Sequence, residues 1–244
     1  MTKSVSRRRP GRKPRTRALP ARALSFRRRL LTWYRRHQRA LPWRETTDPY
    51  AILVSELMLQ QTQVSRVLGH WPRFLGLYPT VEHLAGASVD AVRDAWQGLG
   101  YYARARNLHA AARHVVEVHE GIFPSDPATL RSLPGIGRYT AGAVASIAFG
   151  SDEAAVDTNV ARVLRRVFRV PGARGSSAHA KRLWSLAERL VPPGRAGDWN
   201  QALMDLGATI CVARRPRCEV CPVAAVCRSA ADGGFSLTAA VRER

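Results

Sequence analysis

The sequence predicts an all-α protein, and three observations support that class. Apolar residues recur at helical spacing in segments of about 10–18 residues. Short turns rich in Pro and Gly separate these segments. No alternation of polar and apolar residues is long enough for a sheet. We therefore expect helices at 24–37, 49–64, 88–97, 103–119, 126–132, 138–149, 159–168, 177–190 and 198–210.

Both ends of the chain are expected to lie outside the helical core. Residues 1–22 are rich in arginine, contain three prolines and have little to bury, so they are predicted to be a disordered basic arm. Order should then begin near Leu24. Residues 228–244 are weakly apolar and are predicted to be a C-terminal tail.

Positive charge dominates the composition. The formal net charge is +21, and residues 1–44 hold 16 of the 39 Lys and Arg but none of the 18 Asp and Glu. This excess favours a polyanionic partner, because neutralising phosphates releases counterions. No apolar run reaches the roughly 18 residues of a membrane span, and no apolar signal segment follows the basic start. We therefore expect a cytoplasmic protein with no membrane contact.

The segment 49–64 is predicted to be a helix that buries an acid. Asp48 can cap it and Pro49 suits the first helical position. Glu56 lies within the apolar run ILVSELML, where a carboxylate is costly. Burial would raise its pKa and leave it protonated near neutral pH. The alternative is a structural pair with a buried arginine such as Arg44.

Amides and aromatic residues follow at two turns. QQTQ occupies 60–63, and GLGYY at 98–102 carries Tyr101 and Tyr102. Such side chains can fill the gap that an extruded base leaves in a duplex. Taken singly, however, the tyrosines are more often core residues.

The segment LPGIGRYTAG at 133–142 predicts a hairpin. Gly135 and Gly137 flank Ile136 directly before an apolar helix. Glycines permit a tight turn and close approach, and the amides at the next helix start can bind an anion. Alone, the motif could be an ordinary turn between helices. The segment VDTNV at 156–160 follows within twenty residues and favours the DNA-binding interpretation.

Asp157 lies at the start of the helix predicted over 159–168. It suits a helix cap, and the helix N-terminus would also keep a functional carboxylate ionised. The two roles are compatible. Together, a protonated Glu56 and an ionised Asp157 would supply the acid and the anion that glycosidic cleavage uses.

The chain has four cysteines, and they are clustered with the spacing C-x6-C-x2-C-x5-C. In a cytoplasmic protein, clustered thiols favour a metal over disulfides. Zinc sites usually use two CxxC pairs, so the wide first gap favours an iron–sulfur cluster, with zinc as the alternative. The cysteines are Cys211, Cys218, Cys221 and Cys227.

The loop between the first two cysteines is strongly basic. It carries Arg214, Arg215 and Arg217 within six positions. If the loop wraps around a cluster, these arginines would form a phosphate clamp. The alternative is a solvated run of charge.

Together these motifs resemble a known family. The resemblance runs colinearly through LPWR (41–44), PYAILVSELMLQQTQV (49–64), GLGYYARARNLH (98–109), LPGIGRYTAG (133–142), VDTNVARV (156–163), NQALMDLGATIC (200–211) and the four cysteines. The chain resembles the helix-hairpin-helix glycosylase superfamily of endonuclease III. Within it, VSELMLQQTQV and GLGYYARARNLH resemble the A/G-mismatch adenine glycosylases of the MutY family.

The resemblance implies a helix-hairpin-helix glycosylase fold with two domains and a [4Fe–4S] cluster. A six-helix barrel domain with the hairpin would span 41–151. An iron–sulfur domain built from both chain ends would combine 23–40 with 152–227. Double-stranded DNA with a mismatched or damaged base pair would lie bent between them, and a monomer associated with the nucleoid is expected.

The resemblance also implies residue roles. Glu56 would protonate adenine, Asp157 would stabilise or trap the oxocarbenium sugar, and Tyr139 and Asn159 would assist. Arg44 would line the base pocket, while Gln61 and Tyr101 would wedge the duplex. The expected DNA contacts are Arg44, Gln61, Thr62, Tyr101, Gly135, Ile136, Gly137, Arg214, Arg215 and Arg217, and the four cysteines would hold the cluster.

Two features depart from the wider family. Endonuclease III-like enzymes have a catalytic lysine where this chain has Tyr139, and Lys181 is poorly placed to replace it. We therefore expect a monofunctional glycosylase without a lyase step. MutY proteins also carry a C-terminal MutT-like domain that reads 8-oxoguanine. Only 17 residues follow Cys227, so we expect that domain to be absent.

Three functions remain open on the sequence. The expected one is excision of adenine mispaired with G or 8-oxoguanine in base excision repair. The second is a thymine or uracil mismatch glycosylase, whose relatives also have tyrosine at the position of Tyr139. The third is a noncatalytic iron–sulfur protein that binds DNA, against which Glu56 and Asp157 argue.

Overall fold

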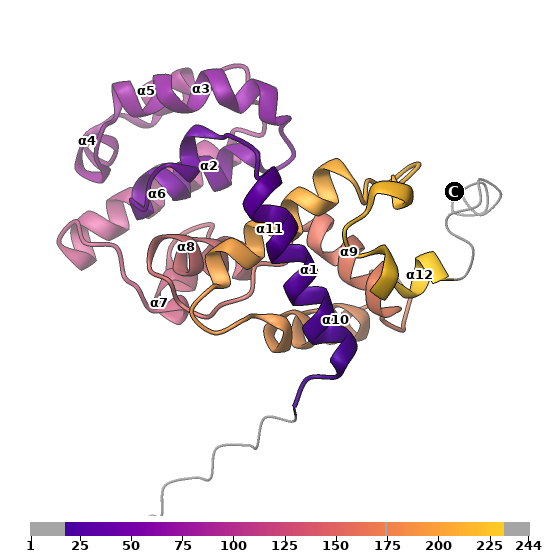
Figure 1. Cartoon of the computed structure of the whole chain (residues 1–244). Coiled ribbons are helices and arrows are strands. Elements are labelled where there is room, and N and C mark those ends of the chain that lie inside the picture. The colour runs from indigo at the N-terminus through magenta and orange to yellow at the C-terminus, as the bar shows by residue number, and fades with distance from the viewer. Residues whose placement is uncertain (1–17, 174, 232–244) are drawn as a thin grey trace, which may run out of the picture.

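The structure, a computed structural model, describes residues 18–231 apart from residue 174 (Figure 1). These residues form helices and no strands, so the predicted all-α class is confirmed. No helix among them is long and apolar enough to cross a membrane. The elements are α1 Ala21–His37, η1 Pro42–Arg44, α2 Pro49–Leu59, α3 Val64–Leu77, α4 Val81–Gly86, α5 Val89–Ala95, α6 Ala103–His119, α7 Pro127–Ser132, α8 Arg138–Ala148, α9 Thr158–Phe168, α10 Ser177–Leu190, α11 Ala196–Thr209, η2 Cys218–Val220, η3 Ala224–Val226 and α12 Arg228–Ala231.

The described helices enclose two hydrophobic cores. One is built by η1 and α2–α8 and contains Trp43 and Trp96. The other is built by α1 and α9–α11, where the rings of Phe26 and Trp199 meet edge to face at 5.5 Å. The N-terminal helix α1 packs on α11 and so completes the C-terminal core (Figure 1). The domain boundaries expected from the sequence stay a prediction, which the membership of these cores supports.

At both ends of the described residues, helix extends further than predicted. Residues 1–17 of the predicted arm and 232–244 of the predicted tail lie outside the described residues. Ala21 and Arg22 already belong to α1, which follows Pro20 and buries Ala23 in its first turn. At the other end, 228–231 form α12, whose Ser229 hydroxyl donates to a carbonyl of α9 at 2.8 Å.

The helix predicted over 49–64 is wrong at its C-terminal end. α2 stops at Leu59, and residues 60–63 form a turn before α3 begins. The guanidinium of Arg104 donates to the carbonyls of Leu57 and Met58 at 2.9 and 2.8 Å. These are among the last carbonyls of α2, which have no amide partner within a helix. A contact from more than forty residues away therefore ends the helix.

Besides α12, the helices α3 and α4 were not predicted. α3 contains Gly69, Pro72 and Gly76, which are turn signals when read locally. Its inward face nevertheless buries Val67 and Phe74 in the first core, and that tertiary contact outweighs the weak local preference.

Candidate active site

A cleft of about 760 Å³ lies between the two cores. Its walls come from η1, α2, the turn at 60–63 and helices α8–α11. A volume of this size is typical of pockets that accept a small organic group. The cleft brings together the four predicted catalytic residues from three separate parts of the sequence, namely Glu56, Tyr139, Asp157 and Asn159.

Glu56 is buried in the cleft wall, with 6% of its surface exposed. The hydroxyl of Tyr139 donates to Glu56 Oε2 at 2.6 Å. Burial raises the pKa of Glu56 to about 7, and the charge of Asp157 acts in the same direction. The hydrogen bond from Tyr139 and the charge of Arg44 lower that pKa in part. The predicted direction is confirmed, and a carboxyl group with this pKa can deliver a proton near neutral pH.

Arg44 lines the same cleft but is paired with a different acid. Its guanidinium donates to both oxygens of Asp205 at 2.8 Å. Arg39 also donates to Asp205, at 2.6 Å. Burial raises the pKa of Asp205, but the bonds and charges of the two arginines outweigh it, and the pKa lies below its ordinary value. The alternative in which Glu56 is the structural partner of Arg44 is therefore wrong.

Sequence reasoning missed Asp205, although a signal for it existed. Asp205 interrupts the apolar run of α11 much as Glu56 interrupts that of α2. It is fully buried. A buried carboxylate must have partners, and here they are two arginines that hold the edge of the cleft.

Asp157 caps α9 and lies in the cleft. Its Oδ1 accepts from the amide of Val160 at 2.7 Å, and its Oδ2 accepts from the side-chain amide of Asn159 at 3.0 Å. Arg162 donates to Asn159 Oδ1 at 2.7 Å and to the carbonyl of Cys211 at 2.8 Å. The predicted cap is confirmed. A continuous chain of hydrogen bonds thus joins this carboxylate to the first cysteine.

Gly207 allows α11 to approach this chain closely. A Cβ at this position would lie 2.6 Å from Asn159 Cβ. We expect Gly207→Ala to lower the free energy of unfolding by about 1–3 kcal/mol through overpacking. Thermal denaturation measures this loss. The matched control is Gly69→Ala in α3, where nothing lies within 4 Å. It should raise stability by about 0.5–1 kcal/mol, and a loss of equal size in both variants would contradict the account.

The hairpin predicted within 133–142 connects α7 to α8 through residues 133–137. Gly135 has a φ of 71°, and a Cβ there would lie 2.4 Å from the Asn107 side chain. Gly137 is the N-cap of α8, and both glycines are exposed. The Ile136 side chain is buried in the first core, with 6% exposed. Its main-chain amide donates to the carbonyl of Leu133 at 3.1 Å, so the DNA contact predicted for Ile136 stays a prediction that this burial does not favour.

The two turns that carry the predicted wedge residues are exposed. Gln61 and Thr62 line the cleft, and Tyr101 is 60% exposed. Gln61 and Tyr101 have φ values of 54° and 47°, in the left-handed region that non-glycine residues rarely adopt. Tyr102 is exposed as well. The alternative that Tyr101 and Tyr102 are core residues is therefore wrong.

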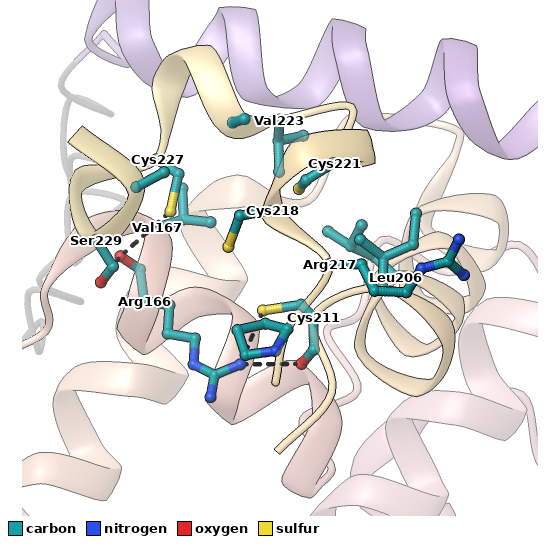
Figure 2. Close-up of a pocket in the computed structure, with 14 residues that line it drawn as sticks. Arg166, Val167, Leu206, Cys211, Arg217, Cys218, Cys221, Val223, Cys227 and Ser229 are labelled. Atoms are coloured by element: carbon teal, nitrogen blue, oxygen red, sulfur yellow. Dashed lines mark hydrogen bonds between the residues drawn. The ribbon is translucent and has the colours of Figure 1, made fainter. Parts of the chain in front are cut away.

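The four cysteines line one cavity (Figure 2). None of them forms a disulfide. Arg166 of α9 donates to Cys211 Sγ at 3.3 Å and to the carbonyl of Val212 at 2.7 Å, so it orders the first ligand. Within 18–231, no three His, Cys, Asp or Glu are spaced to hold a single metal ion. Four thiols around one cavity are the donor set of an iron–sulfur cluster.

The loop between the first two cysteines exposes its three arginines, Arg214, Arg215 and Arg217. The main-chain amide of Arg217 donates to the carbonyl of Ile210 at 2.9 Å, which closes the loop at its base. Exposed side chains suit a phosphate contact and a solvated loop equally, so both alternatives stay open.

Comparison with known proteins gives matches over most of the chain. Residues 54–189 match the HhH-GPD superfamily of base excision DNA repair proteins, and 211–227 match the iron–sulfur binding domain of endonuclease III. The adenine DNA glycosylase of Homo sapiens is 48% identical over 86% of this chain and 40% of the relative. That of Mycobacterium tuberculosis is 44% identical over 80% and 64%. A solved thermostable thymine-DNA glycosylase is 33% identical, with a TM-score of 0.80 over 86% of this chain and 97% of that chain.

Two consequences follow from these matches. The match at 211–227 contains all four cysteines and confirms the predicted [4Fe–4S] cofactor in place of zinc. The chain spans less than two thirds of the length of the two adenine DNA glycosylases.

Proposed function

The chain belongs to the HhH-GPD superfamily of base excision DNA repair proteins and has the helix-hairpin-helix glycosylase fold, and we propose that it is a DNA glycosylase that hydrolyses the N-glycosidic bond of adenine mispaired with guanine or 8-oxoguanine. One observation carries the proposal. The hydrogen bond between Tyr139 and Glu56 lies in a cleft that also presents Asp157. An acid and an anion on one cavity are what glycosidic cleavage requires.

Each residue of the cleft has a defined task in this proposal. Glu56 transfers its proton to a ring nitrogen of the extruded adenine, so that the base leaves as a neutral molecule. Positive charge develops on the sugar as the bond breaks, and Asp157 stabilises it. Val160 and Asn159 hold the Asp157 carboxylate in place. Water then adds to the sugar carbon and loses one proton to the solvent, and the DNA backbone stays intact.

The duplex would be held by exposed groups around the cleft. The hairpin glycines offer main-chain amides to a phosphate, and Gln61 and Tyr101 enter the base stack. The arginines at 214, 215 and 217 contact the phosphate backbone. The [4Fe–4S] cluster, when bound, ties the cysteines on either side of this loop together.

A second candidate is excision of thymine or uracil from mismatches. One observation favours it, namely the 33% identity to a thymine-DNA glycosylase. Adenine is preferred on chemical grounds, because a purine has basic ring nitrogens that can take a proton from Glu56. Thymine has no such nitrogen. The 48% identity to an adenine DNA glycosylase supports the same choice.

We also propose that the enzyme has no lyase step. A Schiff base requires an amine nucleophile near the sugar. Lys181 is the only lysine within the described residues, and it is exposed on α10 and does not line the cleft. The family's catalytic lysine is replaced by Tyr139, whose hydroxyl is bonded to Glu56.

Duplexes that carry A:8-oxoguanine, A:G, T:G or U:G test these proposals. We expect strand breaks at adenine only after alkali treatment, because alkali cleaves the abasic site that a monofunctional enzyme leaves. Breaks confined to thymine or uracil would favour the second candidate. Breaks without alkali would contradict the absence of a lyase step. No break in any duplex would leave a noncatalytic DNA-binding protein.

A further inference from the structure

Arg104, the second residue of α6, is buried without an acid beside it. Only 7% of its surface is exposed. Its guanidinium donates to six neutral oxygens, and its Nε–H has no partner within the described residues. Burial lowers the pKa of this group. A buried cation without a counter-ion lowers the stability of the fold. This cost indicates that Arg104 serves a function as well as filling space.

The six acceptors belong to two turns that are remote in sequence. Three carbonyls and one hydroxyl lie at the end of α2 and in the turn 60–63, and two carbonyls lie in the turn 98–102. The last carbonyls of a helix lack amide partners and carry the negative end of its dipole, so a cation suits them. The acceptors, at distances up to 3.1 Å, are the carbonyls of Leu57, Met58, Gln60, Leu99 and Gly100 and the hydroxyl of Thr62.

Each turn presents one exposed residue in a strained conformation. Gln61 follows the acceptor Gln60 directly, and Tyr101 follows the acceptor Gly100. Both have a left-handed φ that costs energy in a residue with a side chain. The Arg104 guanidinium also lies 5.4 Å from the centroid of the Tyr101 ring. One buried cation therefore holds both strained residues in place.

We propose that Arg104 is a positioning residue for base extrusion, which joins the turns 60–63 and 98–102 into one rigid unit so that Gln61 and Tyr101 enter the duplex together. The inference rests on the proposed function. Arg104 is itself buried and acts through the two turns. Arginine suits this task better than lysine, because its two terminal nitrogens present four N–H groups in one plane, whereas lysine offers three from a single point.

A double-substitution experiment tests the coupling between the turns. Gln61→Ala and Tyr101→Ala are made singly and together, in the wild-type chain and in Arg104→Lys. Extrusion is followed by the fluorescence of 2-aminopurine opposite guanine in a duplex whose sugar resists hydrolysis. In the wild-type chain, base extrusion by the double variant should be no slower than extrusion by the slower single variant. The two turns act there as one rigid unit, so the loss of either residue already disables it. In Arg104→Lys the two effects should multiply.

The lysine substitution itself has a defined expected effect. It should slow base extrusion about tenfold or more, because Gln61 and Tyr101 would no longer be held in the orientation that enters the duplex. Affinity for undamaged duplex should stay within about twofold, since phosphate contacts set it. Arg113→Lys, an exposed position on the same helix that is paired with Glu117, is the matched control and should change neither.

Every outcome decides the proposal. If the pattern of coupling is the same in the arginine and lysine backgrounds, the positioning role is overturned while the proposed function stands. If the wild-type protein extrudes no base, the proposed function fails and the positioning role fails with it. If thermal denaturation shows that Arg104→Lys does not fold, Thr62→Val is used in its place. This variant removes one of the six acceptors of the Arg104 guanidinium. Unchanged coupling in Thr62→Val would then overturn the proposal.

Discussion

Replacing Asp157 with asparagine should strongly slow base excision and leave duplex binding nearly unchanged. The neutral amide cannot stabilise the positive sugar, and losing such an electrostatic contact costs about 10³-fold in rate. The helix should survive, because asparagine caps a helix as well as aspartate does and can still accept from the Val160 amide. Single-turnover excision at an A:G pair measures the first effect. Fluorescence anisotropy with an uncleavable duplex measures the second.

A matched control separates chemistry from capping. Asp126 caps α7 in the same way, with Oδ2 accepting from the Thr129 amide at 2.8 Å, and it lies outside the cleft. Asp126→Asn should therefore leave the excision rate unchanged. Equal loss in the two variants would show that helix capping explains the effect, and full activity in Asp157→Asn would remove that residue from the proposed mechanism.

Local patterns predicted those parts of the fold that depend on local interactions. The structure has α6 and α10 with the predicted bounds, 103–119 and 177–190, and α10 is capped by its own neighbour Ser176. Glu56 could be predicted as buried because it interrupts a continuous apolar run. Asp157 could be predicted as a cap because it directly precedes an amphipathic segment.

Other features depend on contacts between distant segments and could not be predicted locally. The early end of α2 comes from Arg104, which the chain supplies some forty residues later. Arg44 pairs with Asp205, 161 residues away in the sequence, and the alternative of a pair with Glu56 took account only of the buried acid that lies near Arg44 in the sequence. The chain from Asp157 to Cys211 through Arg162 is likewise visible only after folding.

Replacing Glu56 with glutamine should lower the excision rate by about 10²–10⁴-fold, the usual contribution of a general acid. Because the Glu56 pKa is about 7, its proton is present below that pH and is lost above it. The wild-type single-turnover rate should therefore be level below about pH 7 and fall about tenfold per unit above it. The glutamine variant should lack this alkaline fall. A wild-type rate that rises through pH 7 would make Glu56 a base.

The same pKa makes Glu56 a cost to stability at alkaline pH. Its folded-state pKa lies above its ordinary 4.5, so unfolding becomes easier as pH rises from about 4.5 to about 7, and the cost is complete above that. Glu56→Gln avoids this cost, so the variant should be more stable to unfolding by about 1–3 kcal/mol at pH 8, with no gain below pH 4.5.

Tyr139→Phe tests whether the Glu56 pKa, and not the packing around it, sets the pH dependence of the excision rate. The substitution removes a hydrogen bond that lowers the Glu56 pKa. Its alkaline fall in rate should move to higher pH, and a move to lower pH would contradict the assigned role of that bond.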